Sequence, residues 1–137
     1  AAAQHNGYRH FGITHRREVE VTNPDIWKIT DTVTSVQPKA CRTRLHWLLP
    51  DWPWQLERGI IKLDSSLGVV KVNVTFDQPS EMSLACAGEL LLGSGKDEPT
   101  RGWISPTYAH KVPALSYALE VFGPLPVTFV TTYEFPK

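Results

Sequence analysis

The sequence has 137 residues, enough for one domain with a substantial core. Fourteen basic and fourteen acidic side chains give a formal net charge of zero, so no basic excess is present to attract nucleic acid by counterion release. No apolar run approaches the roughly 20 residues of a membrane-spanning helix, and we expect neither a nucleic acid nor a membrane as a partner.

Apolar and polar residues alternate through most of the chain, as expected of half-buried antiparallel strands. Val19 and Val21, for example, fall on one face, and Glu18 and Glu20 on the other. The alternation predicts strands over residues 17–21, 26–33, 41–49, 70–76 and 127–135. Residues 114–122 also alternate. Their composition tolerates a helix, but the prolines that bound this short run favour a strand.

Turn-forming residues separate these segments, with Asn23-Pro24-Asp25 and Gly123-Pro124 among the clearest. This spacing predicts a single all-β domain over residues 1–137, made of two packed antiparallel sheets as in a β-sandwich. The polar stretch 93–101 is expected to be an exposed loop. Because the chain begins Ala-Ala-Ala-Gln-His without an initiator Met, we interpret it as a fragment of a longer protein.

Few residues of this chain are of the types that bind metals. Cys41 and Cys86 have no zinc-site spacing, and they either pair with each other or stay free as small core residues. His5, His10 and His15 recur every five residues, which raises the question of zinc because imidazole is a common zinc ligand. On a strand, odd spacing sends neighbours to opposite faces, so these side chains are not expected to converge. We predict no metal site and no other cofactor in this fragment.

Asp31 shares its face of the 26–33 strand with Ile29 and Val33, which directs a carboxylate toward the core. Such a group costs free energy unless it is paired or hydrogen-bonded. A guanidinium can bind it through two parallel hydrogen bonds. We therefore predict a structural ion pair rather than a catalytic acid, because no second carboxylate is placed near Asp31 in sequence. The candidate partners are Arg16, Arg17, Arg42 and Arg44.

Four side chains are candidates for contact with a sugar. Trp52 and Trp54 lie in a Pro-rich turn, where exposed indole rings would offer flat apolar faces, although we favour their packing in the protein. Tyr108 and His110 could act as general acid and base if a cleft held them together. We favour the alternative that Tyr108 packs into the sheet and His110 is exposed.

A series of short motifs has a recognisable order. His5-Asn6-Gly7-Tyr8 precedes His15-Arg16-Arg17, which leads into a strand, and Asp31 follows in the next strand. Later come Arg42-Thr-Arg-Leu-His-Trp-Leu-Leu49, Ala87-Gly88-Glu89, Gly102-Trp103-Ile-Ser105-Pro-Thr-Tyr108, and Leu125-Pro126 with Thr131. In this order the motifs resemble the C-terminal β-domain of the heparinase II/III-like polysaccharide lyases, over about residues 3 to 135.

The resemblance implies a longer lyase in which an α/α toroid precedes this domain and acidic polysaccharide is cleaved by β-elimination. The family's catalytic Asn, Tyr and His lie mostly in the toroid and the cleft. Its metal ligands lie in an earlier part of the β-domain, so any zinc or calcium site would be upstream. No catalytic residue is therefore carried over to this chain.

From this resemblance we expect the fragment alone to be inactive and the longer protein to be a polysaccharide lyase. The fragment would support the toroid and one wall of the cleft, with the toroid and an acidic polysaccharide as partners. A periplasmic or secreted location is implied. The alternative is a free-standing carbohydrate-binding or structural interaction domain.

One position departs from the family pattern. The family often has Gly after the Tyr of Ser-x-x-Tyr, and this chain has Ala109. Because Gly adopts a left-handed backbone far more readily than other residues, the alanine argues against a left-handed turn at this point.

Overall fold

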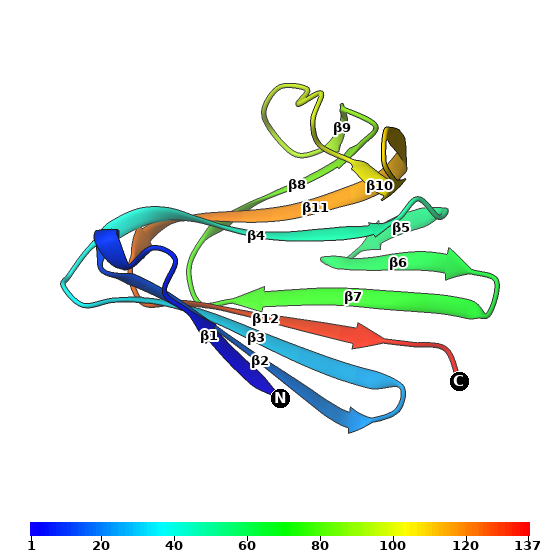
Figure 1. The fold of residues 1–137 in the computed structure, drawn as a ribbon. Coiled ribbons are helices and arrows are strands. Elements are labelled where there is room, and N and C mark those ends of the chain that lie inside the picture. The colour runs from blue at the N-terminus through cyan, green and yellow to red at the C-terminus, as the bar shows by residue number, and fades with distance from the viewer. The chain divides into compact units, whose positions relative to one another are not determined.

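Nearly all regular structure in this protein is β-strand, as a computed structural model describing residues 1–137 shows (Figure 1). The strands form one seven-stranded and one five-stranded sheet, which confirms the predicted all-β fold with two antiparallel sheets. The helical element is a 3-10 turn, η1 (Arg9–Phe11), and no helix is long and apolar enough to cross a membrane. The chain forms two compact units: unit 1 comprises residues 1–41, 52–78 and 123–137, and unit 2 comprises residues 42–51 and 79–122.

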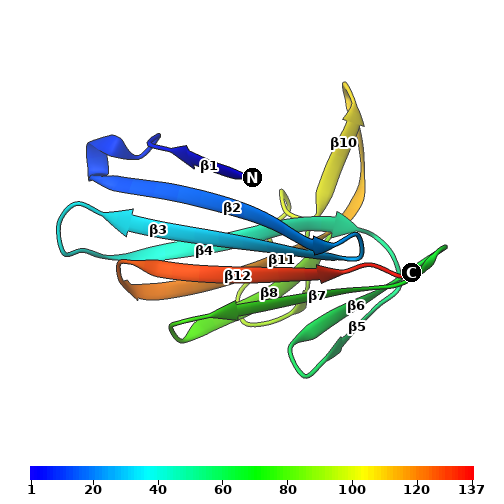
Figure 2. The same ribbon diagram turned by 90° about the horizontal axis from the view of Figure 1, so that it is seen from below.

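Unit 1 contains the seven-stranded sheet, whose strands follow one another from β1 to β5 in Figure 2. Its core lies on one face, because alternate residues of each strand point the same way. Ile61, Val72 and Phe129 on this face are almost completely buried. In sheet order the strands are β1 (Ala2–His5), β2 (Ile13–Asn23), β3 (Ile26–Ser35), β12 (Val127–Glu134), β7 (Gly68–Phe76), β6 (Ile60–Ser65) and β5 (Trp54–Glu57).

Unit 2 contains the five-stranded sheet, organised around the long strand β11 (His110–Pro124). β11 pairs with β8 (Ser80–Cys86) from Leu115 opposite Cys86 to Val121 opposite Ser80. The remaining strands are β4 (Ala40–Pro50) and β10 (Trp103–Thr107), which pair with β11, and β9 (Glu89–Leu92), which pairs with β8. The strand favoured for residues 114–122 is thus confirmed. The sequence of this segment does not distinguish clearly between strand and helix, because Leu115 and Ser116 lie on opposite faces of the strand and are both fully buried.

The turn between β10 and β11 corrects the expectation at Ala109. Thr107 pairs with His110, so Tyr108 and Ala109 form the turn. Ala109 has a φ of 57°, which is the left-handed conformation that the alanine argued against. The short hairpin requires this backbone geometry, and the side chain has not prevented it.

Cys41 and Cys86 do not form a disulfide with each other, and both are half-buried. Cys86 donates a hydrogen bond to Asp51, with Sγ and Oδ1 3.5 Å apart. Burial and the negative charge of Asp51 raise the pKa of the Cys86 thiol. Cys86 is therefore a weakly reactive thiol at neutral pH.

Candidate functional site

Asp31 lies in a charged cluster on the core face of unit 1. The register of β2 and β3 places Arg17 directly opposite Asp31. Arg17 donates from Nε to Oδ1 over 2.7 Å and from Nη2 to Oδ2 over 3.0 Å. Asp31 is 2% exposed, so this bidentate contact supplies the hydrogen bonds and opposite charge that a buried carboxylate requires.

A histidine completes this cluster. His15 Nε2 lies 2.7 Å from Asp31 Oδ1 and donates to it. His15 also faces His5, because these residues pair across β1 and β2 and their rings lie 5.5 Å apart, edge to face. The three histidines do not all converge, because His10 lies apart in η1, but His5 and His15 come together. Strand pairing brings the two residues together, which their spacing along the chain does not reveal.

No arrangement in the chain fits a metal ion. His10 lies in η1 and its ring contacts that of Phe11, with centroids 4.0 Å apart. His5 Nδ1 accepts a hydrogen bond from the Gly7 backbone. No group of three His, Cys, Asp or Glu side chains is close enough to hold a metal ion.

The other three candidate arginines have different partners from Asp31. Arg16 points to the opposite face of β2 and pairs with Glu18 over 2.5 Å. Arg42 and Arg44 belong to unit 2, where both pair with Glu120. Of the four candidates, only Arg17 pairs with Asp31, because it alone lies on the adjacent strand and points to the inward face.

Unit 2 has a polar sheet face that the sequence analysis missed. Arg101, from the loop after β9, is almost buried and donates to the Ser116 hydroxyl over 3.1 Å and to the Ser116 carbonyl over 3.0 Å. The same guanidinium donates to the Ser83 hydroxyl over 3.2 Å. These contacts fasten the loop to the sheet. The predicted loop over residues 93–101 is confirmed, but Arg101 within it is almost buried rather than exposed.

His46 joins this network through Ser116, with Nε2 and Oγ 2.7 Å apart. Partial burial lowers the pKa of His46, and the positive charges of Arg101 and Arg44 lower it further. The imidazole is thus kept neutral at neutral pH. Ser116 is fully buried, so this Ser–His contact is inaccessible to a substrate and serves to hold the sheet face together.

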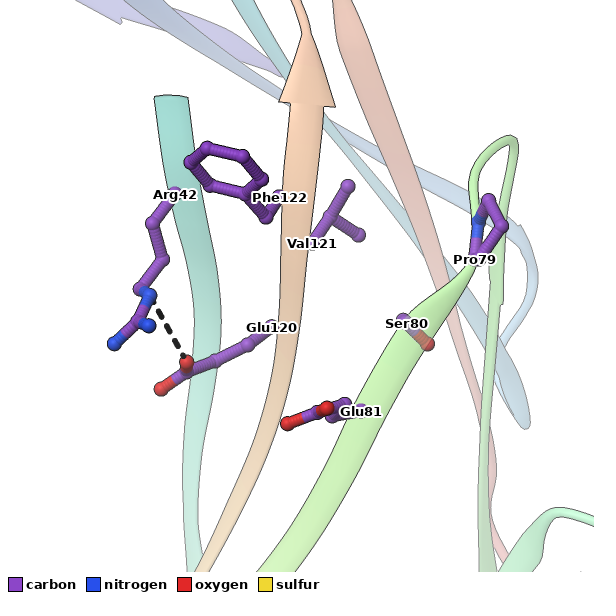
Figure 3. Close-up of a pocket in the computed structure, with 7 residues that line it drawn as sticks. All are labelled: Arg42, Pro79, Ser80, Glu81, Glu120, Val121 and Phe122. Carbon is purple, nitrogen blue, oxygen red and sulfur yellow. Dashed lines mark ion pairs between the residues drawn. The ribbon is translucent and has the colours of Figure 1, made fainter. Parts of the chain in front are cut away.

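A groove of about 280 Å³ lies on this face of unit 2 (Figure 3). Arg44 Nε binds Glu120 over 2.7 Å, while Arg42 Nε is 3.7 Å from the same carboxylate. Glu81 lies directly opposite Glu120 in the sheet, and Figure 3 shows it reaching from β8 toward β11. The Phe122 ring lies beside Arg42 in the same view. The groove is lined by Arg42, Pro79, Ser80, Glu81, Glu120, Val121 and Phe122.

The four sequence candidates for sugar contact divide between the units. Trp52 is 38% exposed and Trp54 is half-buried, and both belong to unit 1. Tyr108 and His110 belong to unit 2 and are exposed at the β10–β11 turn, Tyr108 completely so. The expectation that Tyr108 packs into the sheet is wrong, because the turn directs it into solvent. Neither residue lines the groove described above.

The geometry agrees with that of known lyases over nearly the whole chain. A heparinase III described as the BT4657 gene product matches with a TM-score of 0.75 and 16% identity, over 97% of this chain and 19% of its own. The heparan sulfate lyase HepC from Pedobacter heparinus matches with a TM-score of 0.68 and 13% identity, over 99% and 20% respectively. At these identities the likeness shows the fold, and the chain spans about a fifth of either protein.

Sequence comparison gives the family itself. No curated protein is significantly similar to the chain. Residues 1–132 match the family described as heparinase II/III-like, C-terminal, which takes in both units and both sheets. The chain belongs to the heparinase II/III-like C-terminal family.

Proposed function

We propose that this chain is the non-catalytic C-terminal β-domain of a polysaccharide lyase that acts on uronate-containing polysaccharide. The family match over residues 1–132 carries the proposal. The solved structures support it, since one is titled a heparinase III and another a heparan sulfate lyase. The chain spans about a fifth of each, so the proposal assigns the chemistry to residues outside this sequence.

The reaction proposed for the longer protein is β-elimination. A base removes the proton next to the uronate carboxylate, the bond to the leaving sugar oxygen breaks as that oxygen takes up a proton, and a double bond forms in the uronate ring. In this scheme an upstream toroid supplies the base. This chain supports the toroid and forms one wall of the cleft, without a metal of its own.

The Asp31 cluster supports a scaffolding role. It ties β2 to β3 through a carboxylate that is 2% exposed and fully hydrogen-bonded. Such a pair fixes the register of two strands, which is what a rigid wall requires. Its inaccessibility fits a structural group better than one that exchanges protons with a substrate.

The formation of unsaturated uronate tests the proposal. The chain alone is incubated with heparin, heparan sulfate or alginate, and the ultraviolet absorbance of the product is followed. We expect no increase from the chain alone, and an increase from the longer protein under the same conditions. A sustained increase that depends on the isolated chain would refute the non-catalytic role.

A free-standing carbohydrate-binding domain is the second candidate, and the complete exposure of Tyr108 favours it. An exposed aromatic ring is a surface on which a sugar can stack. Under this alternative Tyr108→Ala would abolish polysaccharide binding by the chain. Under the scaffolding proposal the same substitution leaves the activity of the longer protein unchanged.

A further inference from the structure

We infer that the groove of unit 2 over β4, β11 and β8 is a subsite for one sugar ring of a polysaccharide, with Glu81, Arg42 and Phe122 as its contacts. This inference rests on the proposed function and deepens it, because it assigns a polysaccharide contact to this chain. Of the residues that line this groove, only Arg42 belongs to one of the family motifs, and none is among the four candidates for sugar contact.

The first observation is that the groove contains charged groups whose binding capacity is unused. Glu81 is exposed, and its carboxylate has neither a hydrogen-bond nor an ion-pair partner. The Arg42 side chain is 75% exposed and reaches Glu120 only at 3.7 Å, so most of its five donors are free. The Glu81 carboxylate, which accepts hydrogen bonds, and the Arg42 guanidinium, which donates them, thus lie on opposite sides of Glu120. Two inter-strand spacings, about 9–10 Å, separate their strands.

The second observation is an exposed aromatic ring at the same place. Phe122 is 77% exposed, although it is large and apolar. It lies on the same face of β11 as Glu120, and Figure 3 shows its ring beside Arg42. A ring in this position provides an apolar surface next to hydrogen-bonding groups. The combination of a flat apolar contact with a few polar groups is typical of small-molecule sites.

The chemistry of these groups selects the ligand. A phosphate or another bare anion would be repelled by Glu81 and Glu120, whereas a simple cation would be repelled by Arg42 and Arg44. A sugar ring has hydroxyl groups that donate to a carboxylate and accept from a guanidinium, and C–H groups that pack on an aromatic ring. The groove volume of about 280 Å³ lies just below the roughly 300–1,000 Å³ of most ligand pockets, which suits a single ring.

A neighbouring hollow indicates where the next sugar ring of the polysaccharide would lie. It has a volume of about 120 Å³, shares Glu81 and Glu120 with the groove, and extends to the loop that carries Lys96 and Arg101. Lys96 is exposed and has no ion-pair partner. A second sugar ring in this hollow would place hydroxyl groups within reach of the Lys96 ammonium and of the Glu81 and Glu120 carboxylates.

Binding of defined oligosaccharides to the chain tests the inference. Octasaccharides of heparan sulfate, hyaluronan and alginate are titrated into the chain by calorimetry. We expect at least one to bind, and both Phe122→Ala and Glu81→Gln to weaken that binding about tenfold. Tyr108→Ala and Glu89→Gln are matched controls, because they alter an exposed aromatic ring and an exposed carboxylate of unit 2 outside the groove. Neither control should change the affinity.

Three outcomes would overturn the inference. The first is that none of the three octasaccharides binds the chain. The second is that Phe122→Ala and Glu81→Gln bind as tightly as the unmodified chain, or that affinity is lost with Tyr108→Ala instead. The third is that Glu81→Gln weakens association with the upstream domain but not sugar binding, which would make the groove an interdomain contact. Elimination by the longer protein is measured separately, so the proposed function can stand when the subsite fails.

Discussion

Replacement of Asp31 by Asn tests how unit 1 is held together. Asp31 receives two hydrogen bonds from Arg17 and one from His15, at 2.7–3.0 Å. An asparagine of the same shape keeps one oxygen acceptor but turns an NH₂ group toward donors. At least one contact then becomes donor against donor, and the charge that attracts the guanidinium is lost.

The size of the effect follows from burial. Loss of one partner of a fully buried ion pair costs about 3–5 kcal/mol. Here the Arg17 and His15 side chains are 38% and 28% exposed, so water can solvate both once the carboxylate is gone. We therefore expect Asp31→Asn to lower the free energy of unfolding by about 2–3 kcal/mol. This corresponds to a fall in melting temperature on the order of 10 °C.

Thermal and urea unfolding of a matched set provide the measurement. Arg17→Gln should cost at least as much as Asp31→Asn, because it strands a buried anion with His15 as its one remaining partner. Arg16→Gln, one residue away, should change stability by no more than about 0.5 kcal/mol, since Arg16 pairs at the surface with Glu18. Oligosaccharide affinity should not change in Asp31→Asn. The reasoning fails if Asp31→Asn and Arg16→Gln melt alike.

Three further substitutions test individual features. The pKa of His46 is lowered by partial burial and then by Arg101 and Arg44, so the unfolded chain gains its proton at a higher pH than the folded chain. The stability that neutral His46 contributes is complete above about pH 6.5 and is lost as the pH falls through the pKa of the folded state. Between about pH 7 and 5, the free energy of unfolding of His46→Gln should therefore fall less than that of the parent sequence. Ala109→Gly should stabilise the protein by about 0.5–1 kcal/mol, because it relieves a left-handed alanine with φ of 57°. Gly102→Ala should lower the free energy of unfolding by about 3 kcal/mol, since the added Cβ would lie 2.7 Å from backbone atoms. Gly59→Ala should lower it by only about 1 kcal/mol, because Gly59 also has a positive φ but has open space around it.

Urea unfolding measures all three effects. An unchanged pH dependence in His46→Gln would assign the acid sensitivity to other groups. Destabilisation by Ala109→Gly would mean that the alanine contributes more through its contacts than its backbone strain costs. Equal effects of Gly102→Ala and Gly59→Ala would show that steric contact around residue 102 is relieved without cost.

Local sequence information predicted the long strands and an arginine partner for Asp31, with four arginines left as candidates. Period-two alternation is visible where one face is buried, which is why the cores of β2, β3, β4, β7 and β12 were found. The register of the β2–β3 hairpin then selects Arg17, because Arg17 and Asp31 are equally distant from Pro24 in the turn that joins these strands. A hairpin fixes its own register through the turn.

The features that the sequence did not predict depend on pairing between distant segments. β1 is exposed along its whole length, so no apolar alternation marks it as a strand. The groove of unit 2 combines residues of β4, β8 and β11, which lie far apart in the sequence. Glu81 and Glu120 become neighbours only through the register of β8 and β11, which no local turn determines. For the same reason the sequence could not distinguish Arg42 and Arg44 from Arg17 as partners of Asp31.

The proposed role of this chain as a required but non-catalytic domain is tested most directly by its deletion from the longer protein. The initial rate of unsaturated uronate formation from heparan sulfate is compared between the longer protein and a version that ends before residue 1 of this sequence. We predict that the deletion removes most of the elimination activity while the toroid remains folded by circular dichroism, because one wall of the cleft is gone. Elimination at the full rate by the shortened, folded protein would contradict the account.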